Sequence, residues 1–210
     1  MPADATKAQT RVKKRPAAFT REALAEARRV AILRGAAASF NRHGFANSSM
    51  DDVARELAIT KPTLYRYFPS KHAILAACHN LAMDLTEQAI RAAAGGATGL
   101  ERFLAFARAN LRIILGELGT FPVITEVDAL LPADRRRVIQ RRKQISTWLK
   151  ATLTEGMADG SIAQSDANLT SLYVLGVFNW VPLWYRAEGP NSTDEIVEQY
   201  LALFRRTLAA

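Results

Sequence analysis

The spacing of prolines and glycines is the feature that most constrains the fold of this chain. No proline lies between Ser70 and Phe121 or between Ala133 and Val181. Ala, Leu, Arg, Glu and Gln dominate these intervals, and no stretch alternates apolar and polar residues between hairpin turns. Because these residues favour helices and strand patterns are missing, the sequence predicts an all-α fold of about nine helices.

Helix breakers and cap residues divide the predicted fold into three segments. Residues 1–19 are expected to form a flexible basic tail, residues 20–70 hold three helices, and residues 71–210 hold longer helices suited to a larger bundle. Thr20 is the expected N-cap of the first helix. The predicted helices cover 20–42, 49–57, 60–68, 71–94, 99–117, 121–131, 133–156, 166–187 and 193–208.

The net charge of +8 lies entirely in the first third of the chain. Residues 1–72 hold 14 Lys and Arg against six Asp and Glu, whereas the rest of the chain holds 14 of each kind. A basic segment joined to a neutral body favours a polyanion as the partner of the first segment. Charge alone leaves nucleic acid, an anionic membrane and a merely solubilising tail open.

Two short predicted helices are joined by Ala58, Ile59 and Thr60, which makes a helix-turn-helix. Ser48 and Asp51 resemble a capping pair for the first helix, while Thr60 and Pro62 supply an N-cap and an early proline for the second. Such a second helix can enter the major groove with its first turn aimed at base edges.

The side chains at the start of the second helix suit contact with DNA bases. Lys61 can donate to guanine acceptors, and Pro62 and Thr63 offer apolar contact to a thymine methyl group. Tyr65, Arg66 and Tyr67 add an aromatic and cationic wall, and Lys71 begins the next helix. The core of this small module is predicted to consist of Val53, Ala54, Leu57, Ile59, Leu64 and Phe68.

Residues Gly44–Ala54, Ile59–Lys71 and Leu75 resemble the DNA-binding segment of the TetR family of transcriptional regulators. The resemblance implies a helix-turn-helix DNA-binding domain at 20–70 and an effector-binding and dimerisation domain at 71–210. It also implies base contacts from Lys61, Pro62, Thr63 and Tyr65 and phosphate contacts from Ser49, Thr63, Tyr67 and Lys71.

Two positions depart from the family pattern. Ala58 occupies the place where the family usually has a turn glycine, so a positive φ there would cost about 1 kcal/mol. Asp51 lies early in the supporting helix, where a basic residue could reach DNA, and no DNA contact is expected from it.

The C-terminal part resembles the effector domain of a TetR subgroup that responds to acyl-coenzyme A esters in lipid and steroid catabolism. The resemblance is carried by residues 176–180, 184–186, 189–192, 195–196, 200 and 203–204. It implies an acyl-CoA effector, although an aromatic helix here would serve a dimer bundle whatever the ligand. Arg135–Arg137 and Arg141–Lys143 could bind a nucleotide phosphate of such an ester, but a solvated helix face explains these cations better.

The body is expected to hold an effector pocket and a dimer interface. The pocket is predicted from aromatic residues and an isolated amide, namely Phe106, Phe121, Trp148, Asn179, Trp180 and Trp184. The last two helices are expected to pair with those of a second copy by burying Leu172, Leu175, Val197, Leu201 and Phe204.

The run from Ala167 to Tyr185 is uncharged over 19 residues, which approaches the length of a membrane span. Asn168, Asn179 and Pro182 within it favour instead a helix buried in protein, so no membrane partner is expected. Pro182 is expected to kink this helix.

No pattern in the chain indicates catalysis or a cofactor. No phosphate-binding glycine loop or nucleophile motif is present, and His43, His72, His79 and Cys78 have no zinc spacing. His72 and His79 are expected at exposed helix positions, and the absence of a signal-peptide pattern favours the cytoplasm.

The sequence therefore predicts a ligand-controlled regulator. It is expected to be a repressor that binds a palindromic double-stranded DNA operator as a homodimer and is released by a small-molecule effector. An effector that is a hydrophobic drug or an aromatic acid is the alternative, and an acyl-chain enzyme or a helical adaptor is disfavoured because neither explains the helix-turn-helix. The sequence names neither the operator nor the effector, and it leaves activation open.

Overall fold

The computed structural model of the chain describes residues 20–117, 126–186 and 188–210. Over these residues it contains helices and no strand, with one isolated bridge between Ile162 and Ala209. The predicted all-α fold is confirmed. None of the described helices combines the length and hydropathy that a membrane span needs.

The eight α-helices of the described residues follow the predicted order. Their bounds are α1 Arg21–His43, α2 Met50–Glu56, α3 Lys61–Tyr67, α4 Lys71–Ala92, α5 Gly99–Arg112, α6 Pro132–Ala158, α7 Ala167–Trp184 and α8 Thr193–Leu208. A π-helical turn, η3 (Ile113–Glu117), extends α5. Part of the helix predicted over 121–131 lies outside the described residues, and its described part forms only the 3-10 turn η5 (Val127–Ala129).

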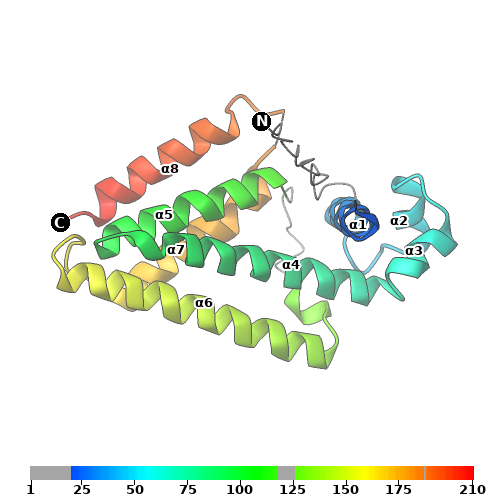
Figure 1. Ribbon diagram of the computed structural model, residues 1–210, viewed down its shortest axis with the longest axis horizontal. Helices are drawn as coiled ribbons and strands as arrows, with labels where there is room; N and C mark the ends of the chain where they lie inside the picture. Colours follow the sequence, from blue (N-terminus) through cyan, green and yellow to red (C-terminus); the bar gives the residue numbers. More distant parts are fainter. Residues whose placement is uncertain (1–19, 118–125, 187) are drawn as a thin grey trace, which may run out of the picture.

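The helices form a small group at one end of an elongated molecule and a larger group at the other (Figure 1). We call α1 to α3 the head and α5 to α8 the body. Helix α4 leaves the head and runs into the body, with α6 beside it (Figure 1). This arrangement places the helix-turn-helix at one end of the elongated molecule (Figure 1).

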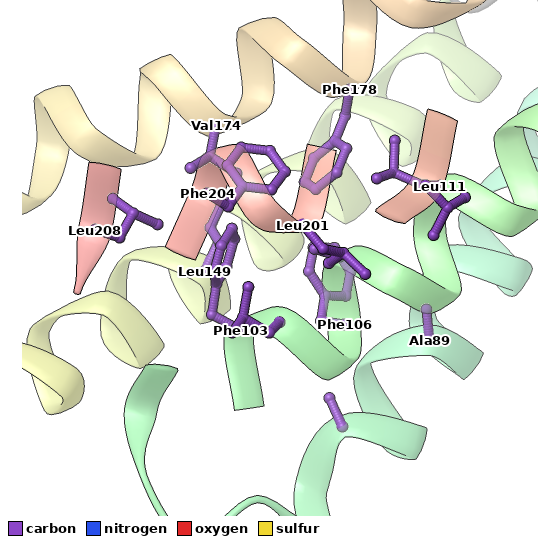
Figure 2. Packing of buried hydrophobic residues seen from close by; sticks show 14 of the residues in the cluster. Ala89, Phe103, Phe106, Leu111, Leu149, Val174, Phe178, Leu201, Phe204 and Leu208 are labelled. Carbon is purple, nitrogen blue, oxygen red and sulfur yellow. The ribbon is translucent and has the colours of Figure 1, made fainter. Parts of the chain in front are cut away.

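The buried apolar side chains form two main clusters. The first lies in the head, and it also includes Leu130 and Val138 from the body side. The second lies among α5 to α8, where Phe204 packs edge-on against Phe103 with ring centroids 5.2 Å apart (Figure 2). Because α4 supplies residues to both clusters, the predicted domain boundary after residue 70 stays a prediction.

Helices α5 and α6 approach each other closely at two glycines. A Cβ on Gly99 would lie 2.3 Å from the Cα of Gly156, which no real side chain could accept. The N–H of Gly99 donates to the Asp159 carboxylate at 2.7 Å, so the start of α5 is bound to the end of α6. Close backbone contact therefore requires glycine at this crossing.

Candidate nucleic-acid interface and effector region

The N-cap of the first helix of the helix-turn-helix lies one residue later than the sequence predicts. Ser49 is the N-cap of α2, and it forms a reciprocal capping box with Asp52. The Ser49 hydroxyl and N–H hold the pKa of the Asp52 carboxyl below its ordinary value. The predicted pairing of Ser48 with Asp51 is wrong, because the buried Ser48 hydroxyl instead donates to the Gly44 carbonyl at 2.8 Å.

The turn between α2 and α3 takes the strained form expected at Ala58. Ala58 has φ of 50°, the left-handed region that favours glycine. The following N–H, of Ile59, donates to the Ala54 carbonyl at 3.0 Å and closes the turn. Thr60 then caps α3 by accepting from the N–H of Thr63, as predicted.

Packing orients α3 with one side inward and the other outward. Val53, Ala54, Leu64 and Phe68 are buried, and Leu57 and Ile59 pack against them half-buried, which confirms the predicted core of the module. Helix α3 therefore turns its opposite side to solvent. Its exposed side chains are Lys61, Pro62, Tyr65 and Arg66.

Tyr65 is 44% exposed, so it does not pack into the core of the head. Thr63 and Tyr67 are half-buried, and the Arg66 guanidinium lies 5.5 Å from the ring centroid of Tyr67. An exposed aromatic ring with cations beside it suits a groove lined by bases and phosphates.

Asp51 forms an ion pair with Lys61, on the exposed surface of α3. Its carboxylate lies 2.8 Å from the ammonium of Lys61, and both side chains are about half exposed, at 54% and 53%. The hydrogen bond from Lys61 to Asp51 raises the pKa of the Lys61 ammonium. The ion pair thus links the start of α2 to the first residue of α3.

Lys71 has a structural role that the sequence did not indicate. Its ammonium donates to the carbonyls of Phe45, Ala46 and Ser48 at 3.0 to 3.1 Å. These three bonds use all three N–H donors of an ammonium group. Lys71 therefore fixes the loop between α1 and α2, which argues against the predicted phosphate contact. The Ser49 hydroxyl is likewise engaged, in the cap of α2.

Family comparisons agree with this geometry. Residues 32–78 match the family described as bacterial regulatory proteins, tetR family, and residues 96–208 match a tetracyclin repressor-like C-terminal domain. The chain belongs to the TetR family. Regulators of this family bind DNA and are not enzymes, so the family also supports a regulatory rather than a catalytic chain. No curated protein sequence matches the chain significantly.

Solved structures share the fold over nearly their whole length. A TetR/AcrR-family transcriptional regulator from Thermobifida fusca YX-ER1 is 32% identical, with a TM-score of 0.61 over 85% of this chain and 97% of that one. The ketosteroid transcriptional regulator KstR2 of Mycobacterium tuberculosis is 24% identical, with a TM-score of 0.79 over 87% and 95%.

A third solved structure is AibR in complex with isovaleryl coenzyme A and operator DNA. It is 24% identical, with a TM-score of 0.69 over 84% of this chain and 97% of that one. At 24% identity, the comparison shows only that AibR and KstR2 have the same fold as this chain.

Of the six predicted effector residues, the five that the structure describes do not gather at one place in the body. The rings of Phe106 and Trp148 touch, with centroids 4.9 Å apart, and Phe106 is buried. Asn179, Trp180 and Trp184 lie on the exposed side of α7, which argues against their lining an interior pocket of a single chain. Phe121 lies outside the described residues.

An open groove of about 540 Å³ lies along α6 beside Trp148. Its lining consists of Gln140, Lys143, Gln144, Thr147, Trp148 and Ala151, which face the groove mainly with apolar atoms. Of these residues, the sequence predicts Trp148 as an effector contact, and Lys143 belongs to the cation cluster Arg141–Lys143 that could bind a nucleotide phosphate. A helical spacing of polar residues around one tryptophan was visible in the sequence, but it resembles any solvated helix face.

The predicted dimer residues divide into inward and outward groups. Val197, Leu201 and Phe204 are buried in the core of the same chain, so their assignment to an interface is wrong. Figure 2 shows Leu201 and Phe204 among the core side chains. Leu172 is 55% exposed. It belongs to a set of large apolar side chains exposed on α7 and α8, which we call the apolar surface: Leu169, Leu172, Tyr173, Trp180, Leu183, Trp184 and Leu203.

Two titratable side chains of α4, Cys78 and His79, are buried. Among the described residues, no cluster of three His, Cys, Asp or Glu side chains is placed to hold a metal. Burial raises the pKa of the Cys78 thiol to about 12, so it is protonated at neutral pH. His79 is fully buried, and its predicted exposed position is wrong because the residue faces the core between α4 and its neighbours.

Proposed function

We propose that this chain is a transcriptional repressor that binds a palindromic operator as a homodimer in the cytoplasm and is released by a small-molecule effector. The observation that carries the proposal is the outward face of α3, where Lys61, Pro62 and Tyr65 are exposed while Leu64 anchors the helix. A short helix held in this way can place its first turn against base edges in the major groove.

The apolar surface of α7 and α8 supports the dimer. Trp180 is 64% exposed and Leu169 is 66% exposed, which is unusual for large apolar residues gathered on two neighbouring helices. A second copy packed against this surface about a twofold axis would bury the apolar surfaces of both copies at once. Two heads would then be held at a fixed spacing, as two operator half-sites require.

Contacts between α4 and α6 support control by a ligand. Arg141 of α6 donates to Asp84 and Glu87 of α4 at 2.7 and 2.9 Å, and its side chain is only 17% exposed. Val138, one turn earlier, packs into the core of the head. A ligand that shifts α6 would therefore shift α4 and the head with it.

Thermodynamic linkage makes the effect of the ligand on DNA binding equal to the effect of DNA on ligand binding. A ligand that prefers a body conformation with wrongly spaced heads weakens DNA binding by the same factor by which DNA weakens the ligand. Coupling of about 1–3 kcal/mol is typical of such systems.

An acyl-CoA ester is the effector we propose. The C-terminal sequence resemblance supports it, and AibR, a protein of the same fold, has been solved with isovaleryl coenzyme A. Trp148 in the groove along α6 offers a flat apolar face, and Lys143 in the same groove offers a cation for a phosphate. A hydrophobic drug or an aromatic acid is the alternative, favoured by the contact of Phe106 with both Trp148 and Phe178.

Equilibrium binding with variants of α3 tests the DNA-binding role. Lys61→Ala should weaken operator binding by about 1–3 kcal/mol with a smaller loss on unrelated DNA, because a base contact is lost. Tyr65→Ala should also weaken it without unfolding the body, since the ring is exposed. Lys150→Ala, an exposed cation on α6, is the control and should bind as the wild type does. Unchanged operator binding by both α3 variants would refute this assignment of α3.

Thermal melting and DNA release test the effector. Acyl-CoA esters should raise the melting temperature, because a ligand of the native state adds RT ln(1 + [L]/Kd) to its stability. They should also release the protein from DNA. If CoA esters of several chain lengths and ring types change neither quantity, while a hydrophobic drug or a free aromatic acid changes both, the alternative effector class is correct.

A further inference from the structure

Two neighbouring carboxylates at the start of α2 have different surroundings. Asp52 accepts from the N–H and hydroxyl of Ser49, so its carboxylate belongs to the capping box. Asp51 has no part in this box, and it extends across the turn to α3. Asp52 therefore caps α2, whereas the carboxylate of Asp51, in the same first turn, contacts α3.

The contact of Asp51 is with the cation best placed to meet DNA. Its two carboxylate oxygens lie 2.8 and 3.0 Å from the ammonium of Lys61. Lys61 is the first residue of α3, and neither side chain is held by the core, since both remain about half exposed, at 54% and 53%. A carboxylate thus lies on the surface that would face the phosphate backbone.

We propose that Asp51 is a specificity-determining residue of the DNA interface, which withholds the Lys61 ammonium from phosphates and shares it only with a base acceptor in the operator. This inference rests on the proposed DNA-binding function. A phosphate contact carries no sequence information, whereas a contact with a guanine edge does. Asp51 therefore lowers the affinity for unrelated DNA more than the affinity for the operator.

The size of the effect follows from the exposure of the pair. An exposed ion pair contributes little free energy, so Asp51 competes only weakly with a phosphate for the Lys61 ammonium. Loss of the pair should change the affinity for DNA by about two- to fivefold for each head. The change should depend on salt, because an ammonium that gains a phosphate contact releases about 0.9 of a counterion. The raised pKa of Lys61 agrees with an ammonium that is held by a carboxylate.

The test compares Asp51→Asn with the wild type in the full chain, on the selected operator and on a random duplex over a range of salt. We expect tighter binding to the random duplex by about two- to fivefold for each head and a smaller change on the operator. The plot of log K against log salt for random DNA should become steeper by about 0.9 for each head. Glu22→Gln removes the same charge from α1 and should change the two DNAs equally.

The same substitution in a Lys61→Met background shows whether Asp51 acts through Lys61. In that background we expect Asp51→Asn to leave the ratio of operator to random affinity unchanged. An unchanged ratio for Asp51→Asn alone, or an equal change in both backgrounds, would overturn the inference while the DNA-binding function stood. Failure of the wild type to prefer any DNA site would overturn the function and the inference together.

Discussion

The head and the body place their apolar side chains differently. Among the described residues of the head, the large apolar side chains are buried or half-buried except for Leu24 and Tyr65, and Lys61 and Arg66 are exposed on the same helix as Tyr65. The body fills its core and in addition exposes the apolar surface of α7 and α8. One region therefore presents a polar face with a single aromatic ring, and the other presents an apolar face.

This difference indicates two different partners. A polar and cationic face keeps its solvation until it meets a polyanion, whereas an apolar face gains free energy from any apolar contact that excludes water. The proposed DNA contact of the head and the proposed self-association of the body thus follow from one contrast in surface chemistry. Each of the following predictions changes one side of the contrast.

The largest effect is expected at the apolar surface. Trp180→Asp places a charge where the proposed dimer buries an indole that is 64% exposed in the single chain. The dimer should weaken by about 2–4 kcal/mol, as for an interface hot spot, and sedimentation at micromolar concentration should show monomer. Leu131→Asp, at an exposed position before α6, is the matched control and should stay dimeric. A wild-type chain that sediments as a monomer would contradict the proposed interface.

The packed core of the body is tested at the crossing of α5 and α6. Gly99→Ala should lower the free energy of unfolding by about 1–3 kcal/mol, because the added methyl would meet the backbone of Gly156. Urea unfolding measures this loss. Gly95→Ala has no atom within 4 Å of its added Cβ and should change stability by less than about 0.5 kcal/mol. Equal behaviour of the two variants would show that the crossing tolerates a side chain.

The smallest effect is expected in the turn of the head. Ala58→Gly should raise the stability by up to about 1 kcal/mol, because it relieves the strain of φ at 50°. Thermal melting of the full chain measures the shift. Ala38→Gly, at an exposed position inside α1, should instead destabilise by about 1 kcal/mol. The same sign for both variants would mean that Ala58 bears no strain in solution.

Sequence reasoning succeeded where short-range rules apply. The caps at Thr20 and Thr60, the strained turn at Ala58 and the exposed side of α3 all depend on residues within one turn of each other. The sequence predicts the capping pair of α2 one residue too early, because Ser48 and Ser49 are both followed three residues later by an aspartate. Local spacing alone could not separate these two pairs.

Sequence reasoning failed where the answer depends on which neighbour a helix face meets. Val197, Leu201 and Phe204 share one face of α8, as their spacing indicates, but one apolar face fits a partner or the core of its own chain equally well. Helix α7 is apolar on all sides, so its pattern could not show that Trp180 and Trp184 point outward. The three carbonyl partners of Lys71 lie 23 to 26 residues away, beyond any local pattern.

Selection of bound DNA from a random pool by the full chain tests the central claim most directly. The account predicts enrichment of one inverted repeat, with half-sites separated centre to centre by about one turn of DNA, 10–10.5 bp, or a multiple of it. The Lys61→Ala variant should enrich this sequence less at the positions that α3 reads. A wild-type pool that remains random after repeated rounds, at salt low enough for binding, would contradict the account.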